Sequence, residues 1–169
     1  MARNVEIKAR IEDLATTRQL VAEVAGAEPE ILSQVDTYFN VETGRLKLRE
    51  FSDTEADLIY YLRPDACGPT ESHYQRVSIS EPQSLRELLT GALGVCGEIR
   101  KRRHVYLVGR TRVHLDEVEG LGYFMELEVV LEGEEPTDVG VAEAQRLMRS
   151  FGVPEDALVA DAYVDLLNE

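Results

Sequence analysis

Lysine and arginine side chains recur at every second position in several short segments of the chain. Arg45, Lys47 and Arg49 are spaced in this way, and so are Lys101 and Arg103. Residues two apart on a strand point to the same face, so each set places like charges side by side. Two such charges about 4 Å apart repel by ~1 kcal/mol in water and by ~4 kcal/mol at an effective dielectric near 20. The sets therefore require an anionic partner, which is either a group of nearby acids or a polyanionic ligand.

Acidic side chains follow the same spacing. Glu126 and Glu128 are two residues apart, Glu6 lies in another alternating segment, and Asp116 shares a strand face with His114. Carboxylate oxygens are ligands for Mg²⁺ and Mn²⁺, often together with substrate phosphates. The acids and bases together predict a combined metal and polyphosphate site. A lone strand histidine is as often a hydrogen-bonded structural residue as a ligand, so both roles stay open for His114.

Motifs for other common chemistries are missing. The chain has no GxxxxGK[ST] phosphate loop, no GxSxG elbow and no HExxH zinc motif. Cys67 and Cys96 have no CxxC spacing, which disfavours a metal or redox site at the cysteines. The predicted chemistry therefore depends on positioning and electrostatics rather than on a nucleophilic side chain.

The composition narrows the class of protein. With 169 residues, 44% of them hydrophobic, we expect a single globular domain over residues 1–169. The net charge of -14 disfavours binding to nucleic acid or to an anionic membrane. The early charged residues leave no apolar stretch for a signal peptide, and no segment is long and apolar enough to span a membrane. We expect a cytoplasmic protein.

Alternating and amphipathic segments predict the elements that position these side chains. The strands are expected at residues 4–11, 31–40, 45–51, 57–63, 73–80, 97–108, 111–118 and 123–131. Helices are expected at 14–25, 82–93 and 138–150, the first capped by Asp13 and ended by Gly26. The strand connections are short, which favours antiparallel pairing and an α+β fold.

In order and spacing, these segments resemble the CYTH or triphosphate-tunnel superfamily of class IV adenylyl cyclases, thiamine triphosphatases and inorganic triphosphatases. The matching segments are Asn4-Val-Glu-Ile-Lys8, Gln34-Val-Asp-Thr-Tyr38, Arg45-Leu-Lys-Leu-Arg49, Tyr61-Leu-Arg-Pro64, Ile99-Arg-Lys-Arg-Arg103, the stretch 112–122, Glu126-Leu-Glu128 and Ala162-Tyr-Val-Asp-Leu166. The stretch 112–128 is similar to the cyclase branch. The resemblance implies a closed eight-stranded antiparallel barrel with helices packed outside it and a charged tunnel through it.

The resemblance also implies roles for individual residues. The triphosphate-binding residues would be Lys8, Arg45, Lys47, Arg49, Arg63, Lys101, Arg103 and Arg112, of which Lys8, Arg63 and Lys101 would act in catalysis. The metal, Mg²⁺ or Mn²⁺, would be held by Glu6, Asp116, Glu126 and Glu128. Tyr38, Tyr61 and Tyr163 are expected to be packing residues, and Arg100 and Arg102 to lie on the outside; no role is assigned to Gln34 or Asp36.

One position departs from the family pattern. Asn4 stands where the first signature glutamate is expected, and an amide is a weaker ligand for a hard cation than a carboxylate. The reaction expected first is conversion of ATP to cyclic AMP and pyrophosphate. The alternatives are hydrolysis of thiamine triphosphate, tripolyphosphate or a nucleoside triphosphate, and an inactive polyphosphate-binding module. A homodimer is a further expectation.

Overall fold

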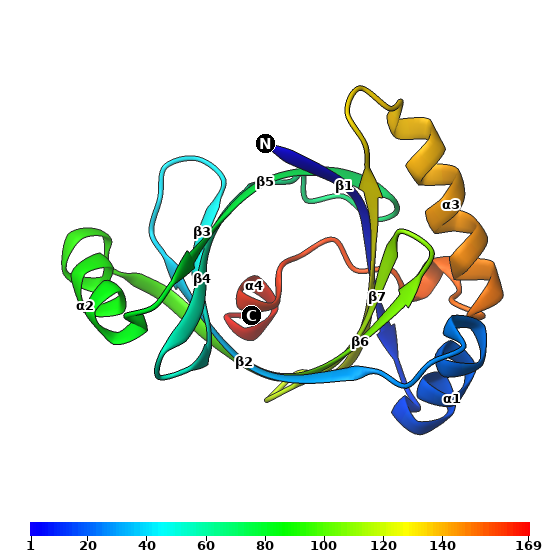
Figure 1. Cartoon of the computed structure of the whole chain (residues 1–169), viewed down its shortest axis with the longest axis horizontal. Coiled ribbons are helices and arrows are strands. Elements are labelled where there is room, and N and C mark those ends of the chain that lie inside the picture. Colours follow the sequence, from blue (N-terminus) through cyan, green and yellow to red (C-terminus); the bar gives the residue numbers. More distant parts are fainter.

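Eight antiparallel strands close into a barrel in the computed structural model, which describes residues 1–169 (Figure 1). The strands are β1 (Ala2–Ile11), β2 (Glu30–Phe39), β3 (Arg45–Ser52), β4 (Glu55–Leu62), β5 (Thr70–Ile79), β6 (Val95–Val108), β7 (Thr111–Val118) and β8 (Gly122–Leu131). Their order around the barrel is β1-β5-β4-β3-β2-β6-β7-β8. The predicted closed eight-stranded barrel is confirmed.

Helices cover the outer face of the barrel. They are α1 (Leu14–Ala25) against β6 and β7, α2 (Pro82–Leu93) against β2 and β3, and α3 (Thr137–Ser150) against β1 and β8. The Asp13 carboxylate accepts a hydrogen bond from the Thr16 amide, and Gly26 ends α1 with φ 68°, as the capping pattern predicts.

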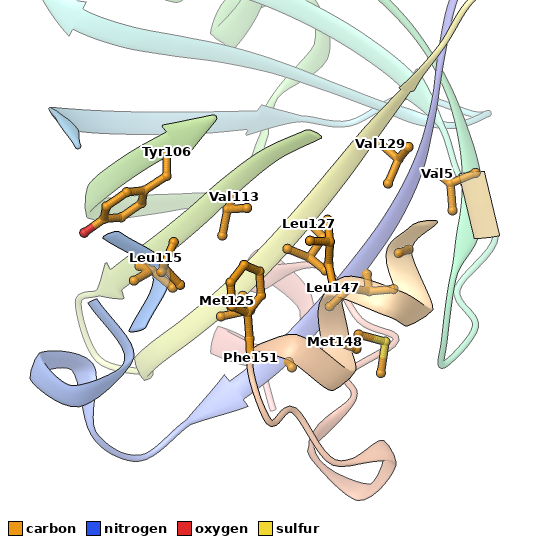
Figure 2. Close-up of a cluster of buried hydrophobic side chains, with 14 of the residues drawn as sticks. Val5, Tyr106, Val113, Leu115, Met125, Leu127, Val129, Leu147, Met148 and Phe151 are labelled. Atoms are coloured by element: carbon orange, nitrogen blue, oxygen red, sulfur yellow. The ribbon is translucent and has the colours of Figure 1, made fainter. Parts of the chain in front are cut away.

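The main apolar core lies between α1, α3 and the barrel wall, rather than inside the barrel. Figure 2 shows this cluster, in which Val5, Leu127 and Val129 of β1 and β8 pack against Leu147 and Met148 of α3. Because side chains alternate along each strand, placing the apolar set outside directs the other set to the interior. The wall is thus stabilised from outside, which leaves the interior free for polar side chains.

The C-terminal segment supplies an element that the alternation patterns did not predict. A 3₁₀ turn (Glu155–Ala157) leads to α4 (Tyr163–Leu167), which lies within the ring of strands in Figure 1. Tyr163 packs there edge-on against Phe124 of β8, with ring centroids 4.9 Å apart. The expectation of three helices, all outside the barrel, is therefore wrong, because α4 is a fourth helix and lies within the ring of strands.

The helices are all short, and none combines the length and the hydrophobicity that crossing a membrane requires.

Candidate functional site

A cavity of about 330 Å³ occupies the interior of the barrel, and every strand contributes to its lining. The contributing positions alternate along the strands, for example Asn4, Glu6 and Lys8 on β1. Eight bases line it: Lys8, Lys47, Arg49, Arg63, Arg76, Lys101, Arg103 and Arg112. Five acids line it: Glu6, Glu30, Asp57, Glu126 and Glu128. The cavity therefore carries an excess of positive charge in a chain whose total charge is negative.

Seven of the eight bases expected to bind a triphosphate line this cavity, and Arg45 does not. The Arg45 guanidinium lies 3.1 Å from a carboxylate oxygen of Asp65 and 2.7 Å from one of Asp165. Arg76, which was not expected, lines the cavity and is 62% exposed. Arg100 and Arg102 lie exposed on the outer face of β6, as their opposite strand phase predicts.

Asp36 organises the bases on one side of the cavity. Its side chain is 1% exposed, and its carboxylate lies 3.1 Å from Lys47, 2.7 Å from Arg49 and 3.6 Å from Lys101. Burial opposes ionisation, but these cations hold the pKa of Asp36 well below its usual range. The alternation along β2 was a sequence signal for this residue, because Asp36 lies two positions from both Gln34 and Tyr38, whose side chains line the cavity. In the β2–β3 register Asp36 lies opposite Arg49.

Asp116 holds a second buried base. Its two carboxylate oxygens accept hydrogen bonds from Arg103 at 2.7 and 2.6 Å, and one of them also accepts a bond of 2.9 Å from the Tyr163 hydroxyl. Asp116 is fully buried behind the cavity wall and is not one of the lining residues. Its contacts therefore fix the orientation of Arg103.

Two lysines of the cavity have lowered pKa values. Burial, followed by the charges of Arg103 and Arg49, lowers the pKa of Lys101 to about 7. Burial is also the main cause that lowers the pKa of Lys8 to about 8. Both ammonium groups lie near the face of the Tyr163 ring, at 4.1 Å for Lys8 and 5.1 Å for Lys101. A bound polyanion would favour the charged form of each lysine.

The C-terminal segment contacts two cavity bases through its backbone. Lys8 donates a hydrogen bond of 2.8 Å to the carbonyl of Asp161, and Arg63 donates one of 3.1 Å to the carbonyl of Ala160. Tyr163, expected only as a packing residue, lines the cavity and bonds to Asp116. This segment therefore builds part of the cavity wall.

Acidic side chains gather on the opposite wall, on β1 and β8. Glu128 accepts a hydrogen bond of 2.8 Å from Arg112, and Glu126 lies 3.4 Å from Arg103. Glu6 lies 3.7 Å from Arg63, and burial together with the charge of Glu128 raises its pKa to about 7. Three carboxylates in one cavity are a donor set that suits a hard divalent cation.

Three side chains on this wall come close enough to share one metal ion. A ring nitrogen of His114 and one carboxylate oxygen each of Glu126 and Glu128 all lie within 4.8 Å of one another. Of the four expected metal ligands, this group contains Glu126 and Glu128. Glu6 lines the cavity nearby, whereas Asp116 is engaged by Arg103.

Comparisons with known proteins agree with this geometry. The family model for the CYTH domain matches residues 2–163. The chain is 25% identical to the Methanocaldococcus jannaschii protein named "Putative adenylate cyclase MJ0240", over 96% of this chain and 97% of that protein.

Solved structures show the same fold. The PH1012 protein from Pyrococcus horikoshii superposes with a TM-score of 0.85 at 23% identity, covering 98% of this chain and 99% of that one. A "putative adenylate cyclase" from Vibrio parahaemolyticus superposes with a TM-score of 0.79 at 18% identity, covering 98% of both chains. With the family model spanning nearly its full length, the chain belongs to the CYTH domain family.

Proposed function

We propose that the chain is a divalent-metal-dependent enzyme that acts on a nucleoside or organic triphosphate, with the conversion of ATP to cyclic AMP and pyrophosphate as its leading reaction. One observation carries the proposal: eight bases line a cavity of about 330 Å³ that also holds a group of carboxylates on β1 and β8. Bases of this density suit a polyphosphate, because each phosphate oxygen can accept charge-assisted hydrogen bonds. The relative named "Putative adenylate cyclase MJ0240" supports this reaction.

The bases would bind and orient the phosphate chain. Arg49 and Arg103 are each fixed by two hydrogen bonds to a buried carboxylate, so their guanidinium groups are positioned before a ligand arrives. Lys8, Lys101 and Arg63 would neutralise charge on the bridging and leaving oxygens. Glu126 and Glu128 would hold Mg²⁺ or Mn²⁺, which supplies Lewis-acid stabilisation of phosphate charge when bound, and Glu6 beside them would stay free to act as a base.

The two candidate reactions differ in the atom that attacks. In the cyclase reaction the ribose 3′-oxygen bonds to the α-phosphorus, the bond from that phosphorus to the bridging oxygen breaks, and pyrophosphate leaves. In hydrolysis, water attacks the terminal phosphorus and phosphate leaves. Glu6 can accept the proton in either case, because its pKa of about 7 matches neutral pH. We keep hydrolysis as the second candidate on that ground.

The proposal extends to location. Cys67 and Cys96 are both free and exposed, which suits the reducing cytoplasm.

Product identification tests the proposal. The protein is incubated with ATP, thiamine triphosphate or tripolyphosphate in Mg²⁺ or Mn²⁺, and the products are separated by chromatography and assigned by phosphorus NMR. We expect metal-dependent turnover that falls by at least about 100-fold in Glu126→Gln. Arg102→Gln is the matched control on the outer face and should retain full activity. Tight tripolyphosphate binding without turnover of any compound would instead identify an inactive binding module.

A further inference from the structure

His114 has a buried ring nitrogen that nothing in the structure satisfies. The residue is 5% exposed and lies on the inner face of β7, where its side chain lines the cavity. Its Nδ1 atom is buried and has no hydrogen-bond partner. Buried polar atoms normally have a partner, so an unpaired one facing a cavity indicates that a ligand completes the site.

The neighbours of this nitrogen are carboxylates. His114 lies directly opposite Glu126 in the β7–β8 register, and its Nδ1 is 3.8 Å from an Oε1 atom of Glu128. One donor atom from each of the three residues lies within 4.8 Å of the others. Metal–ligand bonds of about 2.0–2.2 Å place two ligands of one ion roughly 3–4.4 Å apart. The group therefore needs only a small closure to bind a single ion.

On the β1 side of the same wall, Asn4 is a neutral residue, so Glu6 is the one carboxylate that this strand contributes to the cavity. Asn4 is 2% exposed, and in the orientation that satisfies its hydrogen bonds its amide oxygen accepts from Arg112 at 3.2 Å. This oxygen is thus engaged by a cation. Arg112 also bonds to Glu128, whereas the Nδ1 atom of His114 on β7 has no partner, so it is the unsatisfied atom of this wall.

We propose that His114, Glu126 and Glu128 form a mixed nitrogen and oxygen site that binds a first-row transition ion such as Mn²⁺ in preference to Mg²⁺. Mg²⁺ demands a near-octahedral shell of oxygen ligands and gives up its waters reluctantly, whereas first-row transition ions bind imidazole, and Mn²⁺ among them also suits carboxylates. The ligand assignment does not depend on the proposed function. Only the statement that this ion assists triphosphate chemistry rests on it.

Electron paramagnetic resonance of Mn²⁺ bound to the full chain, without any nucleotide, tests the assignment. Electron spin echo modulation reports nitrogen in the first coordination shell. We expect about one bound Mn²⁺ per chain with nitrogen modulation. His114→Gln should remove that modulation and weaken Mn²⁺ binding about 10- to 100-fold, with little change for Mg²⁺. Arg102→Gln, on the outer face, should change neither.

The other two histidines serve as further controls. His73 lies outside the cavity and His104 is buried beside the Leu115 carbonyl, so His73→Gln and His104→Gln should both keep the nitrogen modulation. These variants assign the nitrogen even if His114→Gln does not fold. Absence of Mn²⁺ binding, Mn²⁺ without nitrogen modulation, or modulation lost with His73 or His104 would each overturn the assignment.

The two proposals fail separately. Nitrogen-coordinated Mn²⁺ in a protein that turns over no triphosphate would leave the metal assignment standing and refute the enzyme. Turnover of a triphosphate with bound Mn²⁺ that has only oxygen ligands would support the enzyme and refute the metal assignment.

Discussion

Asp36 is the residue on which the basic side of the cavity depends. Lys47, Arg49 and Lys101 all lie within 4 Å of its carboxylate, which is buried together with Lys101. Removing one partner of a buried ion pair leaves the other charges uncompensated, at a cost of about 3–5 kcal/mol. We expect Asp36→Asn to lower the free energy of unfolding in urea by this amount. Added tripolyphosphate should recover part of the loss, because it supplies the missing negative charge.

A surface ion pair provides the control for this variant. Arg100 and Glu98 lie 2.8 Å apart, with side chains 58% and 41% exposed. Glu98→Gln should change the free energy of unfolding by less than about 1 kcal/mol, and tripolyphosphate should not alter that difference. A loss from Asp36→Asn that is equally small, or insensitive to tripolyphosphate, would contradict the role given to Asp36.

Strand phase made most of the cavity lining predictable from the sequence. Lys47 and Lys101 have the inward phase of their strands and line the cavity. The alternation along a strand does not show whether an inward-pointing carboxylate reaches the cavity or pairs with a neighbouring arginine. Asp116 has the inward phase but bonds to Arg103, and the importance of Asp36 emerges only when β2, β3 and β6 meet. Such pairings depend on packing between residues far apart in the sequence.

At the scale of elements, α4 is held in the barrel by a close approach to β6. A Cβ atom added at Gly97 would lie 2.4 Å from Cγ2 of Val164, which is too close for both to remain in place. Overpacking of this kind costs about 1–3 kcal/mol. We expect Gly97→Ala to displace α4, so that amide hydrogen exchange over residues 159–167 becomes faster, as measured by mass spectrometry.

Two further variants show whether the contact itself is responsible. Gly91 lies in α2 with no atom within 4 Å of an added Cβ, so Gly91→Ala should leave exchange over residues 159–167 unchanged. Adding Val164→Ala to Gly97→Ala removes the clash and should restore part of the protection. Equal exchange in Gly97→Ala and the unaltered protein would show that α4 is not held by this approach.

The long elements were predictable and the short one was not. The residue ranges 14–25 and 82–93 match α1 and α2, because caps and apolar stripes define them locally. The five residues of α4 are too few for a periodic pattern, and the helix is stabilised by tertiary contacts such as that of Tyr163 with Phe124. The leucines of α2 are not all covered by the barrel, since Leu88 is 63% exposed.

For the whole molecule, the sign of the charge differs between inside and outside. Eight of the 18 bases but only five of the 32 acids line the cavity, so the remaining surface is strongly acidic. A polyphosphate that enters the cavity of about 330 Å³ meets the bases, whereas a DNA duplex is too wide to enter and meets only the outer surface. The net charge of -14 therefore describes the exterior rather than the site.

This separation predicts how ligands change thermal stability. A ligand at 100 times its dissociation constant stabilises the folded state by about 2.7 kcal/mol, which for a chain of this size raises Tm by roughly 5–10 °C. We expect tripolyphosphate to do so in metal-free buffer, and duplex DNA at equal phosphate concentration to cause no shift, in scanning calorimetry. Because the bases inside the cavity provide the affinity, Arg49→Gln should reduce the shift at a fixed ligand concentration, whereas Arg102→Gln should preserve it. A shift with DNA, or one that Arg102→Gln abolishes, would place the anion on the outer surface and refute a binding site inside the barrel.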